Sequence, residues 1–126
     1  MSWQSYVDAN LLGTQKINQA AIVGAQGGVW ATSEGFEISQ TEQEKILQAH
    51  ANSEDVEASG LVIAGVKYFC LSANGRSIYL KKGADGAVVV KTNLAILCCI
   101  YKPPTQGPEA ATVVEGLADY LLGVGF

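Results

Sequence analysis

Hydrophobic and polar positions alternate most clearly in the second half of the chain. Five apolar or β-branched runs occur there, at residues 61–64, 66–73, 77–82, 87–91 and 94–101. Only short turns separate them, and short connections force antiparallel neighbours, because a parallel crossover needs about a dozen residues. The pattern therefore predicts an antiparallel meander. The last run is almost wholly apolar, which indicates that both faces of the sheet are covered.

The first half of the chain predicts a hairpin followed by a helix. Residues 20–24 and 29–32 are short apolar runs joined by a glycine-containing turn, which is typical of paired strands. Ser39 and Glu42 have the spacing of a capping box, so we expect a helix over residues 40–49.

Amphipathic helices are predicted at both ends. Ser2 is a suitable N-cap for a helix over residues 3–12, and Gly13 is a natural residue to end it. Pro108 fits the first position of the last helix. The expected buried stripe of that helix is Val113, Leu117 and Leu121. The order of elements predicts one α+β domain over residues 1–126, with the terminal helices together on one face of the sheet and short helices on the other.

Composition narrows the class of protein. Of the 126 residues 48% are apolar and 16% charged, which is typical of a globular chain rather than a disordered one. The formal net charge of −4 argues against nucleic acid as a main partner, since binding to phosphates needs a basic surface. The sequence shows no apolar run long enough to span a membrane and no secretion signal, so we expect a cytoplasmic protein.

Neither the cysteines nor the histidine suggest catalysis. An odd count of three, with Cys98 and Cys99 adjacent, does not suggest a disulfide framework; in a strand these two side chains point to opposite faces. The single histidine, His50, is expected to be solvated at the end of a helix. No spacing typical of a metal site, a phosphate loop or a catalytic triad occurs, so we expect no enzyme activity, no metal and no cofactor.

Large aromatic side chains occur at both ends of the chain. Trp3 and Tyr6 are three residues apart and share a helical face, while Tyr120 and Phe126 lie in the last seven residues. Flat rings pack well on pyrrolidine rings, and indole N–H and phenol O–H groups can donate to the free carbonyls of a proline-rich peptide. Taken alone, the rings are better explained as filling the space between the terminal helices and the sheet.

Cationic side chains concentrate in the predicted meander. Five of the eight in the chain occur there, namely Lys67, Arg76, Lys81, Lys82 and Lys91. Charges of this kind protect strand edges from aggregation, and they also suit an acidic partner.

Four segments in register over the whole chain resemble profilin. They are the opening Ser2-Trp3-Gln4 with Tyr6-Val7-Asp8, then Val29-Trp30-Ala31-Thr32-Ser33, Arg76-Ser77-Ile78-Tyr79 and Leu117-Ala118-Asp119-Tyr120-Leu121. The resemblance implies a monomeric adaptor that binds monomeric actin and the poly-L-proline segments of elongation factors such as formins, with weaker binding to phosphoinositides. It also implies association with the cytoskeleton.

The resemblance assigns residues to two surfaces. The poly-L-proline site that it implies comprises Trp3, Tyr6, Trp30, Tyr120, Leu121 and Phe126. The actin site that it implies comprises Lys67, Arg76, Tyr79, Lys81, Lys91, Gly107, Glu109 and Glu115. Leu80 stands where many relatives have glycine, so we expect an altered hairpin edge at the actin surface. The alternative is a sensory or regulatory domain of similar fold that binds a small molecule or a phosphoinositide.

Overall fold

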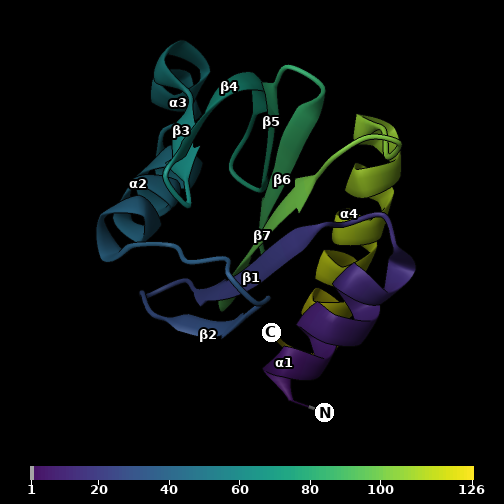
Figure 1. The fold of residues 1–126 in the computed structure, drawn as a ribbon. Helices are drawn as coiled ribbons and strands as arrows, with labels where there is room; N and C mark the ends of the chain where they lie inside the picture. The colour runs from purple at the N-terminus through teal and green to yellow at the C-terminus, as the bar shows by residue number, and fades with distance from the viewer. Residues whose placement is uncertain (1) are drawn as a thin grey trace.

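Seven antiparallel strands form one curved sheet at the centre of the molecule (Figure 1). The structure is a computed structural model that describes residues 2–126. Its strands are β1 (Gln19–Gly24), β2 (Val29–Thr32), β3 (Leu61–Ile63), β4 (Val66–Ala73), β5 (Ser77–Lys82), β6 (Asp85–Lys91) and β7 (Ala95–Tyr101). They are arranged in the order β2-β1-β7-β6-β5-β4-β3, which confirms both the meander and the hairpin.

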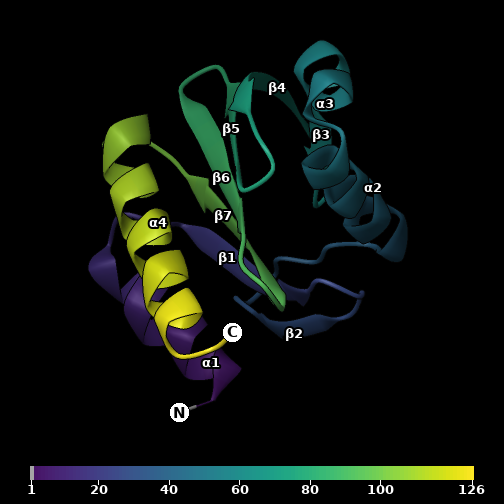
Figure 2. The same cartoon turned by 180° about the vertical axis from the view of Figure 1, so that it is seen from behind.

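Helices cover both faces of this sheet (Figures 1 and 2). Helices α2 (Gln40–Ala51) and α3 (Ser53–Ser59) pack on one face, whereas α4 (Gly107–Gly123) and the N-terminal residues pack on the other. The predicted capping box begins α2: Ser39 Oγ accepts from the Glu42 N–H at 3.1 Å, and Glu42 Oε1 accepts from the Ser39 N–H at 3.0 Å. The fold class is therefore α+β, as expected.

The N-terminal helical segment, residues 3–14, changes its winding along its length. It starts as α1 (Trp3–Ser5), widens to π spacing in η1 (Tyr6–Leu11) and tightens to a 3₁₀ turn in η2 (Leu12–Thr14). The predicted cap is confirmed, since Ser2 Oγ accepts from the Ser5 N–H at 3.2 Å. The predicted end at Gly13 is wrong: the helix continues to Thr14, and Gln15 adopts the left-handed conformation with φ of 63°.

Two hydrophobic cores result, one on each side of the sheet. All seven side chains of β7 are buried, and they alternate between the two cores. Cys99 packs toward the terminal helices and Cys98 toward α2 and α3, as the alternation predicts. Burial raises the pKa of Cys98 to about 12, so this thiol stays protonated and unreactive. No helix within residues 2–126 has the length and apolarity needed to cross a membrane.

Helix α4 starts and packs slightly differently from the prediction. Gln106 is its N-cap, so Pro108 occupies the second helical position rather than the first. Its buried stripe is wider than expected, because the helix contacts the sheet and the N-terminal helical segment together. The stripe consists of Ala110, Val114, Leu117, Ala118 and Leu121, while Val113 is only partly buried.

His50 is buried, which corrects the expectation that it is solvated. Helix α2 continues to Ala51, so His50 lies one turn after Ile46 on the stripe that faces the sheet. Its Nδ1 is 3.0 Å from the Ile46 carbonyl oxygen, and its Nε2 has no hydrogen-bond partner within residues 2–126. Burial lowers the pKa of His50, and the nearby Lys91 ammonium acts in the same direction.

This burial predicts a loss of stability on mild acidification. The unfolded chain takes up a proton as the pH falls through about 6.5, whereas the folded chain, with its lowered pKa, resists protonation until a lower pH. We therefore expect the melting temperature to fall between pH 7.5 and 5.5. In His50→Gln the melting temperature should change less over this range. If the melting temperatures of the two proteins changed equally with pH, His50 would not be the cause of the loss.

Candidate functional site

The two ends of the chain lie near strand β2 (Figures 1 and 2). Five aromatic rings meet there. The ring centroid of Trp3 lies 4.8 Å from that of Trp30, 5.6 Å from Tyr6 and 5.1 Å from Phe126. The fifth ring, Tyr120, lies 6.2 Å from Tyr6. All four pairs are tilted or edge-on, which is the favourable arrangement for aromatic contacts. We call these five residues the aromatic cluster.

Main-chain hydrogen bonds hold the C-terminal ring in place. The Phe126 carbonyl oxygen accepts from the Leu94 N–H at 2.7 Å and from Thr92 Oγ1 at 2.9 Å. The Phe126 N–H donates to the Leu121 carbonyl at 2.8 Å. These bonds fix the last residue to the turn between β6 and β7, so its ring is held against Trp3 rather than free in solvent.

The side-chain amide of Gln4 joins the N-terminal helical segment to β2. Its Nε2 donates to the Thr32 carbonyl at 2.9 Å, and its Oε1 accepts from the Thr32 N–H at 3.4 Å. Trp30, on the same strand, stacks over Gly24, where a Cβ atom would lie 2.7 Å from the Trp30 Nε1. The glycine therefore leaves the space that the indole occupies.

The aromatic cluster is an open apolar surface with polar edges. Trp30 is 40% exposed, Tyr120 51% and Phe126 37%, whereas Tyr6 is buried. Burial raises the pKa of Tyr6, and the neighbouring Tyr120 acts in the same direction, so the Tyr6 hydroxyl is protonated at neutral pH. Leu121, which the sequence placed with these rings, is fully buried beneath them and supports them from the core.

A second open surface occupies the outer part of the sheet. Phe69 and Leu71 on β4 are 67% and 63% exposed, which is unusual for large apolar side chains. Lys81 is directly opposite Phe69 in the β4–β5 ladder, and therefore on the same face. A groove of about 350 Å³ adjoins this face, with Leu71, Tyr79, Tyr101, Gly107 and Pro108 among its lining residues. We call this surface the β4–β5 face.

Sequence reasoning missed Phe69 and Leu71. It selected cations and overlooked the apolar residues between them. A signal was available in β4, where Tyr68 and Cys70 alternate with Phe69 and Leu71. An alternating strand with large apolar residues on both sides must either be covered twice or expose one row.

Leu80 does not alter this face. It is fully buried in the core on the side of α2 and α3, whereas Tyr79 and Lys81 alternate to the other side of β5. The expected change at the hairpin edge is therefore wrong, because the larger side chain enters the core.

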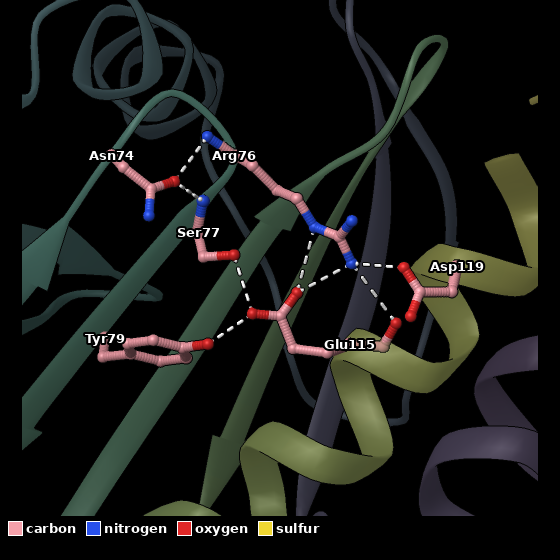
Figure 3. A network of polar contacts seen from close by, with 6 residues as sticks. All are labelled: Asn74, Arg76, Ser77, Tyr79, Glu115 and Asp119. Carbon is pink, nitrogen blue, oxygen red and sulfur yellow. Dashed lines mark hydrogen bonds and ion pairs between the residues drawn. The ribbon is translucent and has the colours of Figure 1, made fainter.

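Glu115 on α4 is the centre of a polar network that ties the helix to β5 (Figure 3). Its carboxylate accepts from Ser77 Oγ at 2.7 Å, from Arg76 Nε at 3.1 Å and from the Tyr79 hydroxyl. The Arg76 guanidinium also pairs with Asp119 Oδ1 at 2.8 Å. Arg76 is therefore not a free surface cation, since two carboxylates of the same chain already balance its charge.

The turn that carries Arg76 is fixed by its own hydrogen bonds. Asn74 Oδ1 accepts from the N–H groups of Arg76 and Ser77, both at 2.8 Å, which is an Asx-turn (Figure 3). The Lys91 N–H donates to the Arg76 carbonyl at 2.8 Å. The guanidinium thus extends toward α4 from a rigid turn.

Hydrogen bonding sets the ionisation of Glu115. Partial burial pushes the pKa of its carboxyl upward, but the bonds from Tyr79, Ser77 and Arg76 outweigh that effect and leave the pKa below its usual value. For Tyr79, burial raises the pKa and the neighbouring carboxylate adds to the rise. Over the physiological pH range, the Tyr79 phenol is therefore protonated and donates its hydrogen bond to the ionised Glu115 carboxylate.

The remaining residues of the expected actin site are dispersed. The ammonium of Lys67 donates to the Ser59 carbonyl at the end of α3. Lys91 lies on the same face of β6 as Val89 and Ala87, which pack toward α2 and α3, so it points to the opposite side of the sheet from Lys81. Glu109 forms an ion pair with Lys16, which follows the N-terminal helical segment; Glu109 Oε2 lies 2.8 Å from Lys16 Nζ. Of the expected residues, only Tyr79, Lys81 and Gly107 share the β4–β5 face, with the Glu115 network beside it.

An antiparallel sheet with helices on both faces and two open, non-overlapping surfaces is the structure of a small protein-interaction domain. The profilin family model matches residues 1–126. The chain belongs to the profilin family.

Individual relatives match over the full length of the chain. Profilin-1B of Acanthamoeba castellanii is 50% identical over 126 residues, with all of both chains covered. The solved structure of profilin IA from the same organism has a TM-score of 0.96 at 49% identity, covering 99% of this chain and 100% of that one. Mouse profilin IIa, solved in complex with a double repeat from the FH1 domain of mDia1, has a TM-score of 0.84 at 25% identity, with both chains fully covered.

The Glu115 network predicts a pH-dependent contribution to stability. Glu115→Gln removes the charge that three donors share, and we expect the free energy of unfolding at pH 7 to fall by about 1–2 kcal/mol. Because the folded pKa of Glu115 is lowered, its contribution is present above the unfolded pKa of about 4.3 and is lost as the pH falls through the folded value. Urea unfolding at pH 7 and pH 3 measures this.

The exposed Glu44 on α2 provides the matched control, since Glu44→Gln makes the same chemical change away from the network. Its unfolding should match wild type at both pH values. If Glu115→Gln and Glu44→Gln were equally stable at pH 7, the prediction that the network stabilises the fold would be contradicted.

Proposed function

We propose that this profilin binds proline-rich segments through the aromatic cluster and monomeric actin through the β4–β5 face. The observation that carries the first part is the convergence of five rings, four from the ends of the chain and one from β2, on one surface. A polyproline II helix has no internal hydrogen bonds, so its carbonyls are free to accept from the surface that binds it.

The geometry of the cluster suits such a ligand. Tilted rings leave shallow spaces into which pyrrolidine rings fit, while the indole N–H and phenol O–H groups at their edges can donate to peptide carbonyls. The rings are already fixed by packing and by the Phe126 and Gln4 hydrogen bonds. Little side-chain freedom is therefore lost on binding, which favours affinity.

The β4–β5 face has the character of an actin contact. Exposed Phe69 and Leu71 provide the apolar centre that protein interfaces need, and Lys81 provides a cation toward an acidic partner such as actin. Covering one end of an actin monomer in this way blocks self-nucleation. Arg76 contributes by fixing the turn and α4 at the edge of this face, because its charge is already balanced internally.

The two surfaces lie on different flanks of α4. Tyr120 is on the flank next to the N-terminal helical segment, whereas Glu115 and Asp119 are on the flank next to β5. One molecule can therefore hold actin and a proline-rich factor such as a formin together, which raises the local concentration of actin near that factor.

The remaining expectations follow from this adaptor role. We place the protein in the cytoplasm in association with the cytoskeleton, acting as a monomer without enzymatic activity. Weak binding to phosphoinositides centres on Lys81, because Lys67 and Arg76 are already bonded within the chain, whereas Lys82 and Lys91 alternate to the other side of the sheet. The alternative, a sensory domain for a small molecule, is not favoured, since the full-length relatives are profilins.

The aromatic cluster predicts a fluorescence response to proline peptides. Trp3 and Trp30 are the two tryptophans of the chain and both belong to the cluster, so a poly-L-proline peptide of about ten residues should change the intrinsic emission. Trp3→Ala should weaken binding by about 2 kcal/mol, as truncation of an aromatic hot spot does. An unchanged spectrum together with no retention on a poly-L-proline column would exclude the site.

The β4–β5 face predicts that charge reversal affects actin alone. Lys81→Glu should weaken binding to monomeric actin at least tenfold, because it replaces attraction by repulsion next to the apolar contact. The melting temperature and proline binding should stay near wild type, since no hydrogen bond of the described chain involves the Lys81 side chain. Lys45→Glu on α2 makes the same charge change on the other side of the sheet and should leave actin affinity unaltered. If both variants sequester actin equally well, the actin contact lies elsewhere.

A further inference from the structure

A groove continues from the aromatic cluster between the N-terminal helical segment and α4, which lie side by side (Figures 1 and 2). It has a volume of about 500 Å³. Tyr6 and Tyr120 line its near end and also belong to the aromatic cluster, so the two spaces share a boundary. Asn10 and Thr14 line one wall farther along, and Val113 and Gly116 line the other.

The length of the groove corresponds to a few residues of extended peptide. From Val113 to Tyr120 the α4 wall spans seven helical steps, or about 10 Å at 1.5 Å per residue. A polyproline II chain rises about 3.1 Å per residue, so roughly three residues fit along this wall. The aromatic cluster then holds one part of a ligand, and the groove can hold the part that adjoins it.

The lining is neutral and mostly apolar. Leu117 forms the floor, Val113 and the two tyrosine rings form the sides, and no charged side chain lines the groove. The Thr14 hydroxyl already donates to the Leu11 carbonyl at 2.7 Å. The Asn10 amide makes no hydrogen bond to any of residues 2–126, and is therefore available to a peptide carbonyl or N–H.

An ion pair follows the far end of the groove. Lys16 Nζ lies 2.8 Å from Glu109 Oε2 and joins the two walls just beyond Thr14 and Val113. Both side chains are exposed and neither lines the groove, so the apolar lining ends before this pair. The groove thus has a defined length as well as a defined chemistry.

Gly116 has no side chain, so this part of α4 does not project into the groove. A Cβ atom at this position would meet nothing within 4 Å, so there is room for a side chain and its absence leaves space in the groove. Glycine in a helix interior is unfavourable relative to alanine, because it loses more conformational freedom on folding. The helix carries that cost at the position where a side chain would fill the groove.

We propose that this groove is a flanking subsite, which binds about three uncharged residues next to the proline-rich core and so selects among proline-rich partners. Gly116 and Asn10 determine its specificity: Gly116 by leaving room, and Asn10 by hydrogen bonding to the peptide backbone. This subsite rests on the proposed binding of proline-rich segments at the aromatic cluster.

Calorimetric titration with three capped peptides tests the subsite. The core peptide has six prolines, and the other two carry Ala-Leu-Ala on its N-terminal or its C-terminal side. For the wild-type protein we expect one of the two extensions, the one whose direction places it in the groove, to raise affinity about fivefold. In Gly116→Leu this gain should disappear while affinity for the core peptide stays within twofold. Asn10→Ala should reduce the gain in part.

Thr112→Leu is the matched control, because it adds an apolar side chain on the exposed surface of the same helix outside the groove lining. It should retain the full gain. Melting curves should show Gly116→Leu to be at least as stable as wild type, since its Cβ enters open space. If Gly116→Leu lowers affinity for the core peptide as much as for the extended one, there is no separate subsite.

The subsite and the proposed function fail in different ways. Binding of the core peptide to wild type without a gain from either extension overturns the subsite and leaves the proline-binding function in place. No binding to wild type of either the core peptide or the poly-L-proline peptide of about ten residues overturns that function, and the subsite with it. A gain that survives in Gly116→Leu also overturns the subsite, because the added residues then bind elsewhere.

Discussion

Strand β7 imposes the constraint on which the rest of the structure depends. All seven of its side chains are excluded from water, and a strand that is apolar on both sides needs cover on both faces of the sheet. Helices α2 and α3 provide that cover on one face, so the other face is left to the two ends of the chain. The rings near both termini meet because the same hydrophobic requirement brings the terminal helices together.

Helix α4 connects this core to both surfaces. Its buried stripe closes the core, one flank faces the N-terminal helical segment, and the other is fixed to β5 by Glu115. The Glu115 carboxylate is stabilised by three donors, and the Arg76 charge is balanced by two carboxylates. The position of α4 relative to β5 is therefore set by polar contacts at the surface as well as by apolar packing beneath it.

Strand and helix positions were largely predictable from the sequence, because they follow from local patterns. The capping box at Ser39, the alternation through Cys98 and Cys99 and the cap at Ser2 all depend on neighbours within a few residues. The residues of the aromatic cluster were also identifiable, although their convergence was implied by the family resemblance.

Features set by tertiary contacts were not predictable. The burial of His50 depends on where α2 ends and on its contact with the sheet, and the burial of Leu121 depends on how the rings lie above it. The partners of Arg76 are about forty residues away in sequence, so no local pattern reveals that its charge is balanced. The side of the sheet that Lys91 faces follows only once the register of β6 is known.

The close contact between the two indoles has an optical consequence. Trp3 and Trp30 come from opposite ends of the first thirty residues, and their centroids lie 4.8 Å apart with planes inclined by 48°. Chromophores this close and in a fixed, non-parallel orientation couple their electronic transitions, which gives circular dichroism bands of opposite sign that neither indole produces alone. The folded chain thus carries an intrinsic spectroscopic signature of the contact between its N-terminal helical segment and β2, readable without any label.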